Sequence, residues 1–436
     1  MKVALLYPEV YDMARFKEHR REFPPFGVLY LAAVIEQAGH NVTINEVTPR
    51  ETYLELRDYD AVGFSLASSA TYGFMREARD HSAIREDALV MAGGVHCNFY
   101  PLDTIKDFRA HVATDGESEE TILEILDRAD TKRFDDVAGV HWRYGTEVRR
   151  GPARPLLRNI DALPLPARHL LDVDDFVIPD RLAGTDLRMA HVMFSRGCPF
   201  PCSFCAAGQT RIQYRSGASA RRELQRLISC YGIEGFAIVD DSFIVNKNKV
   251  GDICDNIEDL GLRWSALSRV DTIDEPLLRK MANSGCIEVK YGMESGSERL
   301  LKMMRKNTKQ EQIKRAIYAA VDAGIEAKVF IIHGFPGEDS ETTDDTIKLL
   351  RDLGAAISRV SLFRFVPLPG TQVYDQVDVY GVYGTHLQPD WDGDWSKFHI
   401  HHNERHWWGT NADWLETERS YRRLRAFVED RWNAQG

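Results

Sequence analysis

The sequence lacks the features of a membrane, secreted or nucleic-acid-binding protein. No apolar run approaches the roughly 20 residues that a membrane-spanning helix needs. The start, from Met1 to Glu9, is typical of a β-strand and has no signal-peptide cleavage site. Basic residues do not dominate, because 55 Lys and Arg stand against 66 Asp and Glu, a formal charge of -11. We therefore expect a cytoplasmic protein without a membrane or nucleic-acid partner.

Cysteines are few, and their number is odd. A chain of 436 residues with seven cysteines and no secretion signal does not indicate a disulfide framework. Four of them are isolated and are expected to be small buried side chains: Cys97, Cys230, Cys254 and Cys286. The other three lie within eight residues of one another, at Cys198, Cys202 and Cys205, and need a different explanation.

The first third of the chain alternates short apolar runs with helical patterns. Strands are expected at 3–7, 41–47, 61–66 and 89–92, and helices at 27–38 and 72–83. This alternation predicts parallel βαβ units, and hence a doubly wound, Rossmann-like α/β domain over residues 1–135. Such sheets bind ligands outside the carboxyl ends of their strands, where the strand order reverses.

The rest of the chain is divided by an irregular, proline-containing stretch. Residues 136–187 are expected to be a linker with a small hairpin around 139–148. Residues 188–375 then carry six apolar strand candidates with helical patterns between them: 191–195, 235–239, 263–268, 286–291, 327–333 and 360–366. Six βα units are too few for an ordinary eight-unit barrel, so we predict a partial (β/α)6 barrel followed by a C-terminal cap at 376–436.

The clustered cysteines directly follow the first barrel strand, with the spacing CxxxCxxC. Thiolates at this density are soft ligands that suit an iron–sulfur cluster or zinc. A structural zinc site would need a fourth ligand at a matching spacing, which is absent nearby. Three thiolates on a [4Fe–4S] cluster would instead leave one iron open to the amine and carboxylate of a small molecule, so the pattern favours iron–sulfur over zinc.

This part of the chain resembles the radical S-adenosylmethionine (SAM) superfamily, whose signature is CxxxCxxC on the loop after the first strand of a partial barrel. Four further motifs match the family at strand ends: Val239-Asp-Asp-Ser-Phe, Tyr291-Gly-Met-Glu-Ser-Gly, His333-Gly-Phe-Pro-Gly-Glu and Val366-Pro-Leu-Pro-Gly-Thr. The resemblance implies that a [4Fe–4S] cluster on the three cysteines cleaves SAM reductively to a 5′-deoxyadenosyl radical, which abstracts hydrogen from the substrate.

The resemblance also implies a set of SAM-binding residues. Glu294 and Ser295 are expected to hydrogen-bond the methionyl ammonium or the ribose, and Arg269 to reach the carboxylate. Phe204 is expected near the adenine, whose hydrogen bonds would come from the backbone around Val366 and Pro367. Each has a structural alternative: Glu294 as an ion-pair partner at the edge of the core, Arg269 as a surface charge, and Phe204 as an ordinary core residue.

The N-terminal domain resembles the cobalamin-binding domain of one branch of this superfamily. The motifs that carry this resemblance are Pro24-Pro-Phe-Gly, Ala38-Gly-His, Val62-Gly-Phe-Ser, Ala92-Gly-Gly-Val-His and Asp115-Gly-Glu-Ser-Glu-Glu. The expected crevice residues are Ser65, Ser68, Gly93, Gly94 and His96. No DxHxxG motif is present, so no histidine is expected to ligate cobalt. Whether cobalamin binds stays open, because Cys97-Asn98 depart from the branch and the loop from Glu9 to Phe23 is long enough to fill the crevice.

The C-terminal cap is acidic, aromatic and rich in histidine. Six of the eight tryptophans follow residue 390, and five of the 14 histidines lie between His386 and His406. We expect a lid over the barrel mouth, with tryptophan faces for a sugar ring or cation. A metal site and a solvated acidic tail are the alternatives. The candidate substrate-binding or acid groups are Asp241 in the barrel and Asp392, Asp394, His401 and Glu404 in the cap.

Two reactions follow from this scaffold. The acidic cap, the altered crevice motif and the short chain after the barrel slightly favour dehydration of a small natural-product substrate such as an aminoglycoside-type sugar, with an acid to protonate the departing hydroxyl. The alternative is a methylcobalamin-dependent C-methyltransferase. A cluster-carrying module without turnover is disfavoured by the full set of motifs. The expected electron donor is a flavodoxin or ferredoxin, with a partner dehydrogenase if the product is reduced further.

Overall fold

The computed structural model describes residues 1–9, 23–182, 185–376, 380, 393–398, 408 and 414–433. The chain forms two compact units, residues 1–176 with 393–399 and residues 177–392 with 400–436. Most of the long loop expected to fill the N-terminal crevice, residues 10–22, lies outside the described residues. In the part of the chain that is described, no helix is long and apolar enough to cross a membrane.

The first unit is built on a seven-stranded sheet with the order β2-β1-β4-β6-β7-β8-β9. Its strands are β1 (Lys2–Pro8), β2 (Asn41–Val47), β4 (Ala61–Ser65), β6 (Leu89–Gly93), β7 (Val112–Thr114), β8 (Val140–Tyr144) and β9 (Glu147–Arg150). The first five are parallel, and β8 and β9 are antiparallel. The chain leaves β1 for β2 on one side and returns to β4 on the other, so the strand order reverses at β1.

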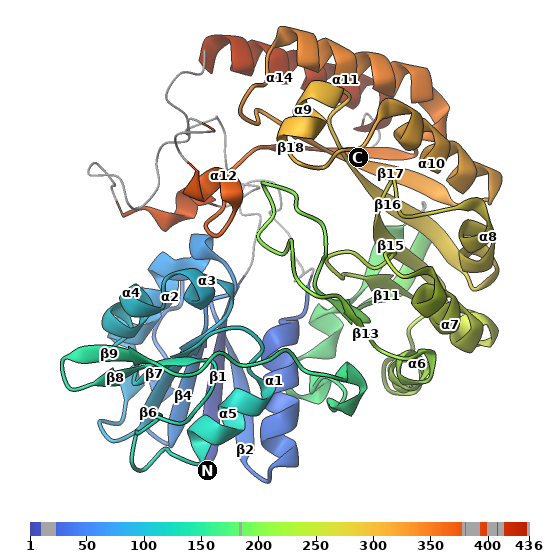
Figure 1. The fold of residues 1–436 in the computed structure, drawn as a ribbon. Helices are drawn as coiled ribbons and strands as arrows, with labels where there is room; N and C mark the ends of the chain where they lie inside the picture. The colour runs from blue at the N-terminus through green and yellow to red at the C-terminus, as the bar shows by residue number, and fades with distance from the viewer. Residues whose placement is uncertain are drawn as a thin grey trace. The chain divides into compact units, whose positions relative to one another are not determined.

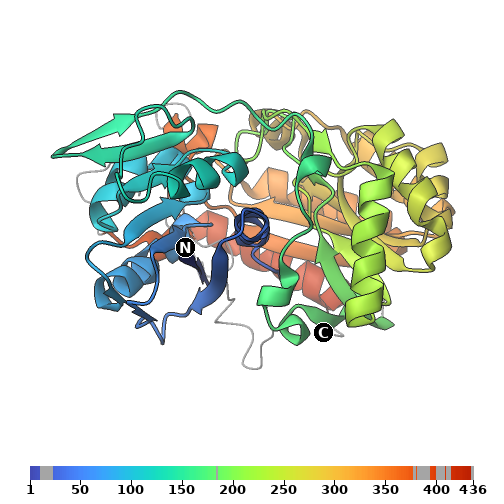
Figure 2. The ribbon, with the colours of Figure 1, turned by 90° about the horizontal axis from the view of Figure 1, so that it is seen from below.

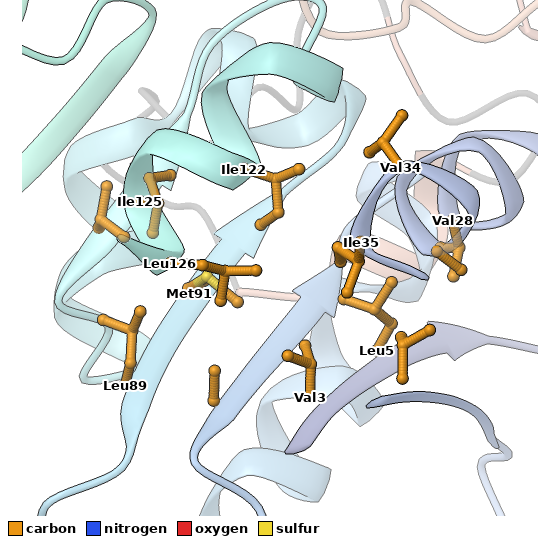
Figure 3. Close-up of a cluster of buried hydrophobic side chains, with 14 of the residues drawn as sticks. Val3, Leu5, Val28, Val34, Ile35, Leu89, Met91, Ile122, Ile125 and Leu126 are labelled. Carbon is orange, nitrogen blue, oxygen red and sulfur yellow. The ribbon is translucent and has the colours of Figure 1, made fainter. Parts of the chain in front are cut away.

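Helices cover both faces of this sheet, as the doubly wound prediction requires (Figure 1). Side chains alternate along β1, so that Val3 and Leu5 belong to one core and Ala4 and Leu6 to the other. The first core lies under α1 (Phe26–Gln37) and α5 (Glu119–Leu126), where Ile35 lies over Leu5 (Figure 3). The second core lies under three helices: α2 (Tyr72–His81), α3 (Val95–Phe99) and α4 (Pro101–Asp107). The short strands β3 (Glu55–Leu56) and β5 (Ala83–Ile84) pair with each other.

The hairpin expected around residues 139–148 is present as β8 and β9. It does not stand in a linker, because β8 pairs with β7 and extends the N-terminal sheet. The compact first unit accordingly continues to residue 176, past the domain boundary expected at 135. Buried Val140 and Trp142 on β8 explain this, since both contribute to the first core.

The second unit contains the predicted partial barrel. Its sheet has the order β10-β11-β14-β15-β16-β17-β18. The strands are β10 (Val177–Leu182), β11 (Thr185–Val192), β14 (Gly235–Ile238), β15 (Arg263–Arg269), β16 (Cys286–Glu294), β17 (Glu326–His333) and β18 (Arg359–Arg364). Six of them, from β11 onward, are parallel, and β10 adds an antiparallel edge. The first parallel strand lies earlier than the expected 191–195, because Ser195–Arg196 (β12) leaves the sheet to pair with Gln213–Tyr214 (β13).

Helices line the outer side of this curved sheet (Figure 1 and Figure 2). They are α6 (Gly217–Tyr231), α7 (Lys247–Ile257), α8 (Glu275–Asn283), α9 (Glu298–Met303), α10 (Gln310–Asp322), α11 (Ser340–Leu353) and α14 (Trp414–Val428), and a short helix α12 (Gln372–Asp375) follows β18. All six parallel strands end at the same edge of the sheet. The strand ends and loops at that edge carry the clustered cysteines, Asp241 and the expected SAM-binding residues.

Candidate functional site

The three clustered cysteines lie on a loop that is closed twice at its base. The β12–β13 pair joins the two ends of the loop. Thr210 then ties down the first cysteine, because Cys198 N–H donates to Thr210 Oγ1 at 2.8 Å and Thr210 N–H donates to Cys198 O at 2.9 Å. All three cysteines are free thiols. The fold therefore presents three thiols from one braced loop at the carboxyl edge of the barrel.

The surroundings of these thiols suit a metal cluster. Burial raises the pKa of the Cys198 thiol, and it raises the pKa of the Cys205 thiol to about 11. Metal binding must therefore displace protons from these groups. Within the described ranges, no three His, Cys, Asp or Glu side chains are grouped closely enough to hold a single metal ion. A four-iron cluster does not need such a group, because each thiolate binds a different iron.

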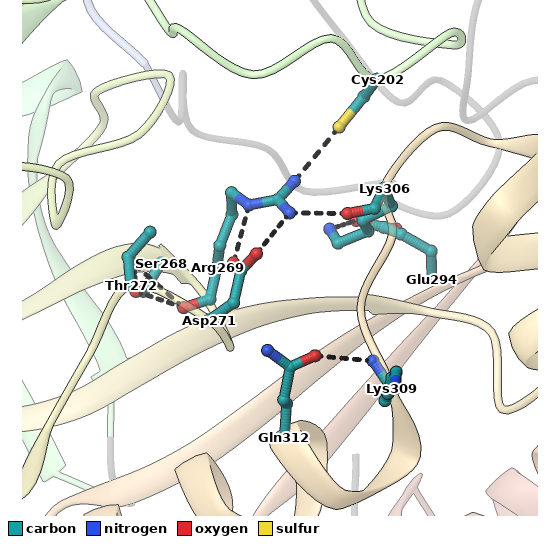
Figure 4. Close-up of polar contacts among 9 residues, drawn as sticks. All are labelled: Cys202, Ser268, Arg269, Asp271, Thr272, Glu294, Lys306, Lys309 and Gln312. Atoms are coloured by element: carbon teal, nitrogen blue, oxygen red, sulfur yellow. Dashed lines mark hydrogen bonds and ion pairs between the residues drawn. The ribbon is translucent and has the colours of Figure 1, made fainter.

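Arg269, at the end of β15, reaches into the cysteine loop (Figure 4). Its Nη1 lies 3.3 Å from Cys202 Sγ, and its Nε and Nη2 each lie 2.8 Å from a carboxylate oxygen of Asp271. Nη2 also donates to Lys306 O at 2.8 Å. Arg269 is only 8% exposed, so the alternative that it is a surface charge is wrong.

Glu294 ends β16 and forms a buried ion pair. Its Oε1 lies 2.7 Å from Lys306 Nζ, and both side chains are almost completely buried. Glu294 has a φ of 62°, a backbone conformation that is uncommon and strained for a residue with a side chain. Gly292 makes room for the pair, because a Cβ there would lie 2.5 Å from Glu294 Oε1. The alternative that Glu294 is an ion-pair partner is thus confirmed, because it pairs with Lys306. Its role in binding SAM stays a prediction.

The other expected SAM-binding residues lie at the same edge of the sheet, where their side chains contact other residues of the chain. Ser295 Oγ accepts the Ser297 N–H at 3.1 Å and lies 3.3 Å from Thr346 Oγ1. Phe204 packs, half-buried, against an apolar cluster that includes Phe365 just after β18. Val366 and Pro367, next in the chain, are buried. The structure therefore brings Phe204 close to the segment that contains Val366 and Pro367, as the prediction requires.

Two adjacent aspartates after β14 brace the cysteine loop. Asp240 accepts the Phe194 N–H at 2.9 Å and the Ser195 hydroxyl at 2.6 Å, and burial raises its pKa to about 8. Asp241 accepts a backbone hydrogen bond from Gly197, and burial raises its pKa as well. Asp241 was expected to face the substrate, and the structure places it against the backbone at the start of the cysteine loop.

In the first unit, the glycines of the expected crevice let neighbouring loops approach each other. Gly94 has a φ of 102°, and a Cβ there would lie 2.7 Å from Leu66 O. A Cβ at Gly93 would lie 2.7 Å from Thr114 Oγ1. Ser65 ends β4, and Ser68 Oγ accepts the Ala70 N–H in the turn that follows.

The loops after β4 and β6 expose residues without a charge at this edge. Ala67, Gly94, Val95 and Asn98 are exposed, and Val95 is 50% exposed. The departure at Cys97-Asn98 does not fill the surface, because Cys97 is completely buried and Asn98 Oδ1 accepts the Gly116 N–H at 3.0 Å. These uncharged residues follow β4 and β6, next to the reversal of strand order at β1, where such sheets bind ligands. A neutral ring system such as the corrin of cobalamin suits them.

His96 does not belong to this open surface. It is 1% exposed, its Nδ1 lies 2.9 Å from Ser69 Oγ, and its ring is 4.4 Å from that of Tyr72 and 5.1 Å from that of Tyr100. The ring of Trp395, from the distant C-terminal segment, covers it at 4.9 Å. The expectation that His96 contacts a ligand in the crevice is therefore wrong, because aromatic rings bury it.

One described segment of the cap, residues 393–398, belongs to the first unit and forms a short 3-10 turn, Trp395–Phe398. Asp394 begins this turn and accepts hydrogen bonds from the backbone N–H and the hydroxyl of Ser396. The Asp394 carboxylate thus stabilises the turn in which it lies. Asp392, His401 and Glu404, the other candidate substrate groups, lie outside the described residues.

Sequence profiles of two families match the chain. The profile of the radical SAM superfamily matches residues 192–350, and the profile of the B12 binding domain matches residues 17–126. An uncharacterized methyltransferase of Pyrococcus horikoshii is 31% identical over an alignment of 365 residues, and the match covers 81% of this chain and 78% of that protein. An anaerobic magnesium-protoporphyrin IX monomethyl ester cyclase of Rubrivivax gelatinosus is 27% identical over 87% of this chain and 71% of that protein.

A solved structure has the same fold over nearly the whole chain. It is the radical S-adenosylmethionine methyltransferase TsrM of Kitasatospora setae, with cobalamin and a [4Fe-4S] cluster bound. The TM-score is 0.70 at 18% sequence identity, and the match covers 98% of this chain and 88% of that chain. Both units, and not the barrel alone, therefore have counterparts in one protein.

Proposed function

Because this chain belongs to the radical SAM superfamily, in the branch that carries a B12-binding domain, we propose that it is a methyltransferase that acts on a small polar substrate. The observation that carries the proposal is the methyltransferase relative, which is 31% identical over 81% of this chain and so spans both units. Methyl transfer is supported better than dehydration. The acidic cap favoured dehydration, but the Asp394 carboxylate accepts hydrogen bonds from Ser396 within its own turn.

The chain provides for a [4Fe–4S] cluster, SAM and cobalamin, which when bound supply one-electron cleavage of SAM and transfer of a methyl group. Cys198, Cys202 and Cys205 hold the cluster. The exposed surface of Ala67, Gly94, Val95 and Asn98 is where we place cobalamin. Radical SAM enzymes need a reductant, and we propose a flavodoxin or ferredoxin for this role.

We assign binding of SAM to the edge formed by β16 and the segment after β18. Lys306 orients the Glu294 carboxylate by bonding Oε1, and the second carboxylate oxygen would accept a hydrogen bond from the methionyl ammonium. Phe204 and the backbone of Val366 and Pro367 would hold the adenine. The Ser295 hydroxyl, engaged by Ser297 N–H, supports the turn that carries Glu294.

The proposal is tested by the products that SAM leaves behind. Methyl transfer converts SAM to S-adenosylhomocysteine, whereas dehydration or another radical reaction leaves only 5′-deoxyadenosine and methionine. We expect the anaerobically reconstituted chain to form S-adenosylhomocysteine only when cobalamin is supplied, and to form 5′-deoxyadenosine as well. Both products are measured by mass spectrometry.

The control is the variant in which Cys198, Cys202 and Cys205 are all changed to Ala. It should lose 5′-deoxyadenosine, which requires the cluster. It should form at most one equivalent of S-adenosylhomocysteine per cobalamin, because no substrate radical is present to take up the methyl group. Formation of 5′-deoxyadenosine without any S-adenosylhomocysteine in the cobalamin-loaded wild type would contradict methyl transfer. Dehydration would then be the better-supported reaction.

A further inference from the structure

The guanidinium of Arg269 contacts one sulfur of the cysteine loop directly. Its Nη1 lies 3.3 Å from Cys202 Sγ, within hydrogen-bond distance for a sulfur acceptor (Figure 4). A cluster held by Cys202 would carry this hydrogen bond on one of its ligands. We propose that Arg269 is a positioning residue that raises the reduction potential of the cluster through the Cys202 thiolate, and that Asp271 limits this effect. The proposal rests on the cluster and not on methyl transfer.

Four hydrogen bonds hold Arg269 in this orientation. Nε and Nη2 each donate to a carboxylate oxygen of Asp271 at 2.8 Å, in the paired geometry that fits a guanidinium best. Nη2 donates again to Lys306 O at 2.8 Å. The fourth bond is the one to Cys202. Arginine has five N–H groups, so four of the five have protein partners and the side chain is not free to swing toward a ligand.

An aromatic ring and burial further restrict the Arg269 side chain. The guanidinium carbon lies 4.1 Å from the centre of the Phe200 ring, a cation–π contact with the loop that carries the cysteines. The side chain of Arg269 is 10% exposed and that of Asp271 is 23% exposed. Little water can screen the pair, so its field at the sulfur is stronger than it would be at the surface.

The direction of the effect follows from the geometry. Reduction adds an electron to the cluster, and hydrogen bonds to its sulfurs together with nearby charge set its potential. A positively charged donor stabilises the more negative, reduced state, which raises the potential. The Asp271 carboxylate contacts Nε and Nη2, whereas Nη1 faces the sulfur, so the positive group is the nearer one and the carboxylate only reduces its effect.

This reading differs from the role in SAM binding that the sequence suggested for Arg269. A residue that binds the SAM carboxylate would change the affinity for SAM when replaced, and would leave the potential of the cluster without SAM unchanged. A residue that only stabilises the loop would lower cluster occupancy, and replacing Arg269 or Asp271 would have effects of the same sign. Only the proposed role predicts potential shifts of opposite sign.

The experiment is a redox titration of the reconstituted full-length chain without SAM, followed by electron paramagnetic resonance of the reduced cluster. We expect Arg269→Gln to shift the midpoint potential to more negative values and Asp271→Asn to shift it to more positive values. Arg269→Lys, which keeps the charge but not the paired geometry, should fall between wild type and Arg269→Gln. The matched control is Arg279→Gln, which removes the same charge from an exposed site on α8 and should leave the potential unchanged.

Each outcome decides the question. If Arg269→Gln fails to hold iron, Arg269→Lys and Asp271→Asn carry the test, because each retains a charged or hydrogen-bonding group at the site. Shifts of the same sign, or no shift, would overturn the proposal, and weaker SAM binding with an unchanged potential would assign Arg269 to SAM instead. A wild-type protein without any cluster signal would overturn the cluster assignment itself, and this inference with it. Loss of methyl transfer with the opposite shifts intact would overturn only the proposed function.

Discussion

Asp240 illustrates how a single buried carboxyl group supports the cysteine loop. It receives hydrogen bonds from the backbone of Phe194 and the hydroxyl of Ser195, the residues that lead from β11 into the loop. Burial outweighs these hydrogen bonds and raises the pKa of Asp240 to about 8. Near neutral pH the folded chain therefore holds a proton on this group that the unfolded chain has released.

This proton makes stability depend on pH. The pKa of Asp240 is about 8 in the folded chain against 3.8 for an unperturbed aspartate, so the folded state binds more protons across that window. Its contribution to the free energy of unfolding is full below the lower value and is lost as the pH rises through the higher one, by up to about 1.4 kcal/mol per pH unit. We expect Asp240→Asn to flatten the slope, because the amide cannot ionise. Its Oδ1 can still accept the Phe194 N–H, and its Nδ2 can donate to Ser195 Oγ.

The measurement is urea unfolding of the metal-free chain at several pH values between 5 and 8. The control is Asp259→Asn, because Asp259 is exposed and its pKa is lowered by its hydrogen bond to Arg221, so that it stays ionised throughout this range. The Asp259 variant should keep the wild-type slope. Equal slopes in wild type and Asp240→Asn would show that Asp240 is ionised in the folded chain.

At the scale of elements, the segment Trp395–Phe398 closes the first unit from the far end of the chain. Trp395 contacts the rings of Tyr72, His96 and Tyr100 at 5.7, 4.9 and 5.4 Å between centroids. His96 lies within α3 and Tyr100 directly follows it. Val95 and Asn98 of the same helix form part of the surface assigned to cobalamin. The segment Trp395–Phe398 therefore packs against the buried side of α3, whose other side is exposed.

We expect Trp395→Ala to loosen α3. Each aromatic contact contributes about 0.5–1.5 kcal/mol beyond its buried area, so losing three should speed amide exchange in residues 94–100 at least about tenfold. Trp395→Phe keeps a ring in place and should show a smaller increase. The readout is hydrogen–deuterium exchange followed by mass spectrometry. Unchanged protection in Trp395→Ala would show that α3 is held by the sheet alone.

At the scale of the whole molecule, the two units carry different cofactor sites. The cysteine loop and its braces all come from residues of the second unit, and the surface assigned to cobalamin comes from the first. Each unit also has apolar core clusters of its own. The loading of iron and of cobalamin should therefore be separable by substitution.

We expect the variant with Cys198, Cys202 and Cys205 changed to Ala to lose iron and keep cobalamin. Gly94→Val should do the reverse, because its side chain would collide with the backbone of Leu66 at a φ of 102° and distort the loops after β4 and β6. Gly73→Ala, at a helical position with open space, is the control and should keep both. Iron and cobalt are measured by mass spectrometry of the purified proteins. Loss of both metals in either of the first two variants would contradict independent sites.

The sequence by itself determined the elements and the chemistry of the cluster. Most of the longer strands, and the two helices for which bounds were predicted, match the structure to within a few residues, because alternating apolar residues and helical periodicity are local properties of the chain. The cysteine spacing is equally local, and it indicated an iron–sulfur ligand set before any fold was known. The pairing of Arg269 with Asp271 is also local, because the two residues are only two positions apart, and it could have been predicted from the sequence.

Only the tertiary structure decided which distant residues meet. Lys306 joins Glu294 across the end of a bulged strand, Arg269 meets a cysteine 67 residues away in sequence, and Trp395 buries His96 from the other end of the chain. None of these pairs has a signature in spacing or composition. Strand order and loop path bring such residues together. Once they are buried, the charges of Glu294 and Lys306 must pair with each other, and His96 packs among aromatic rings in a core.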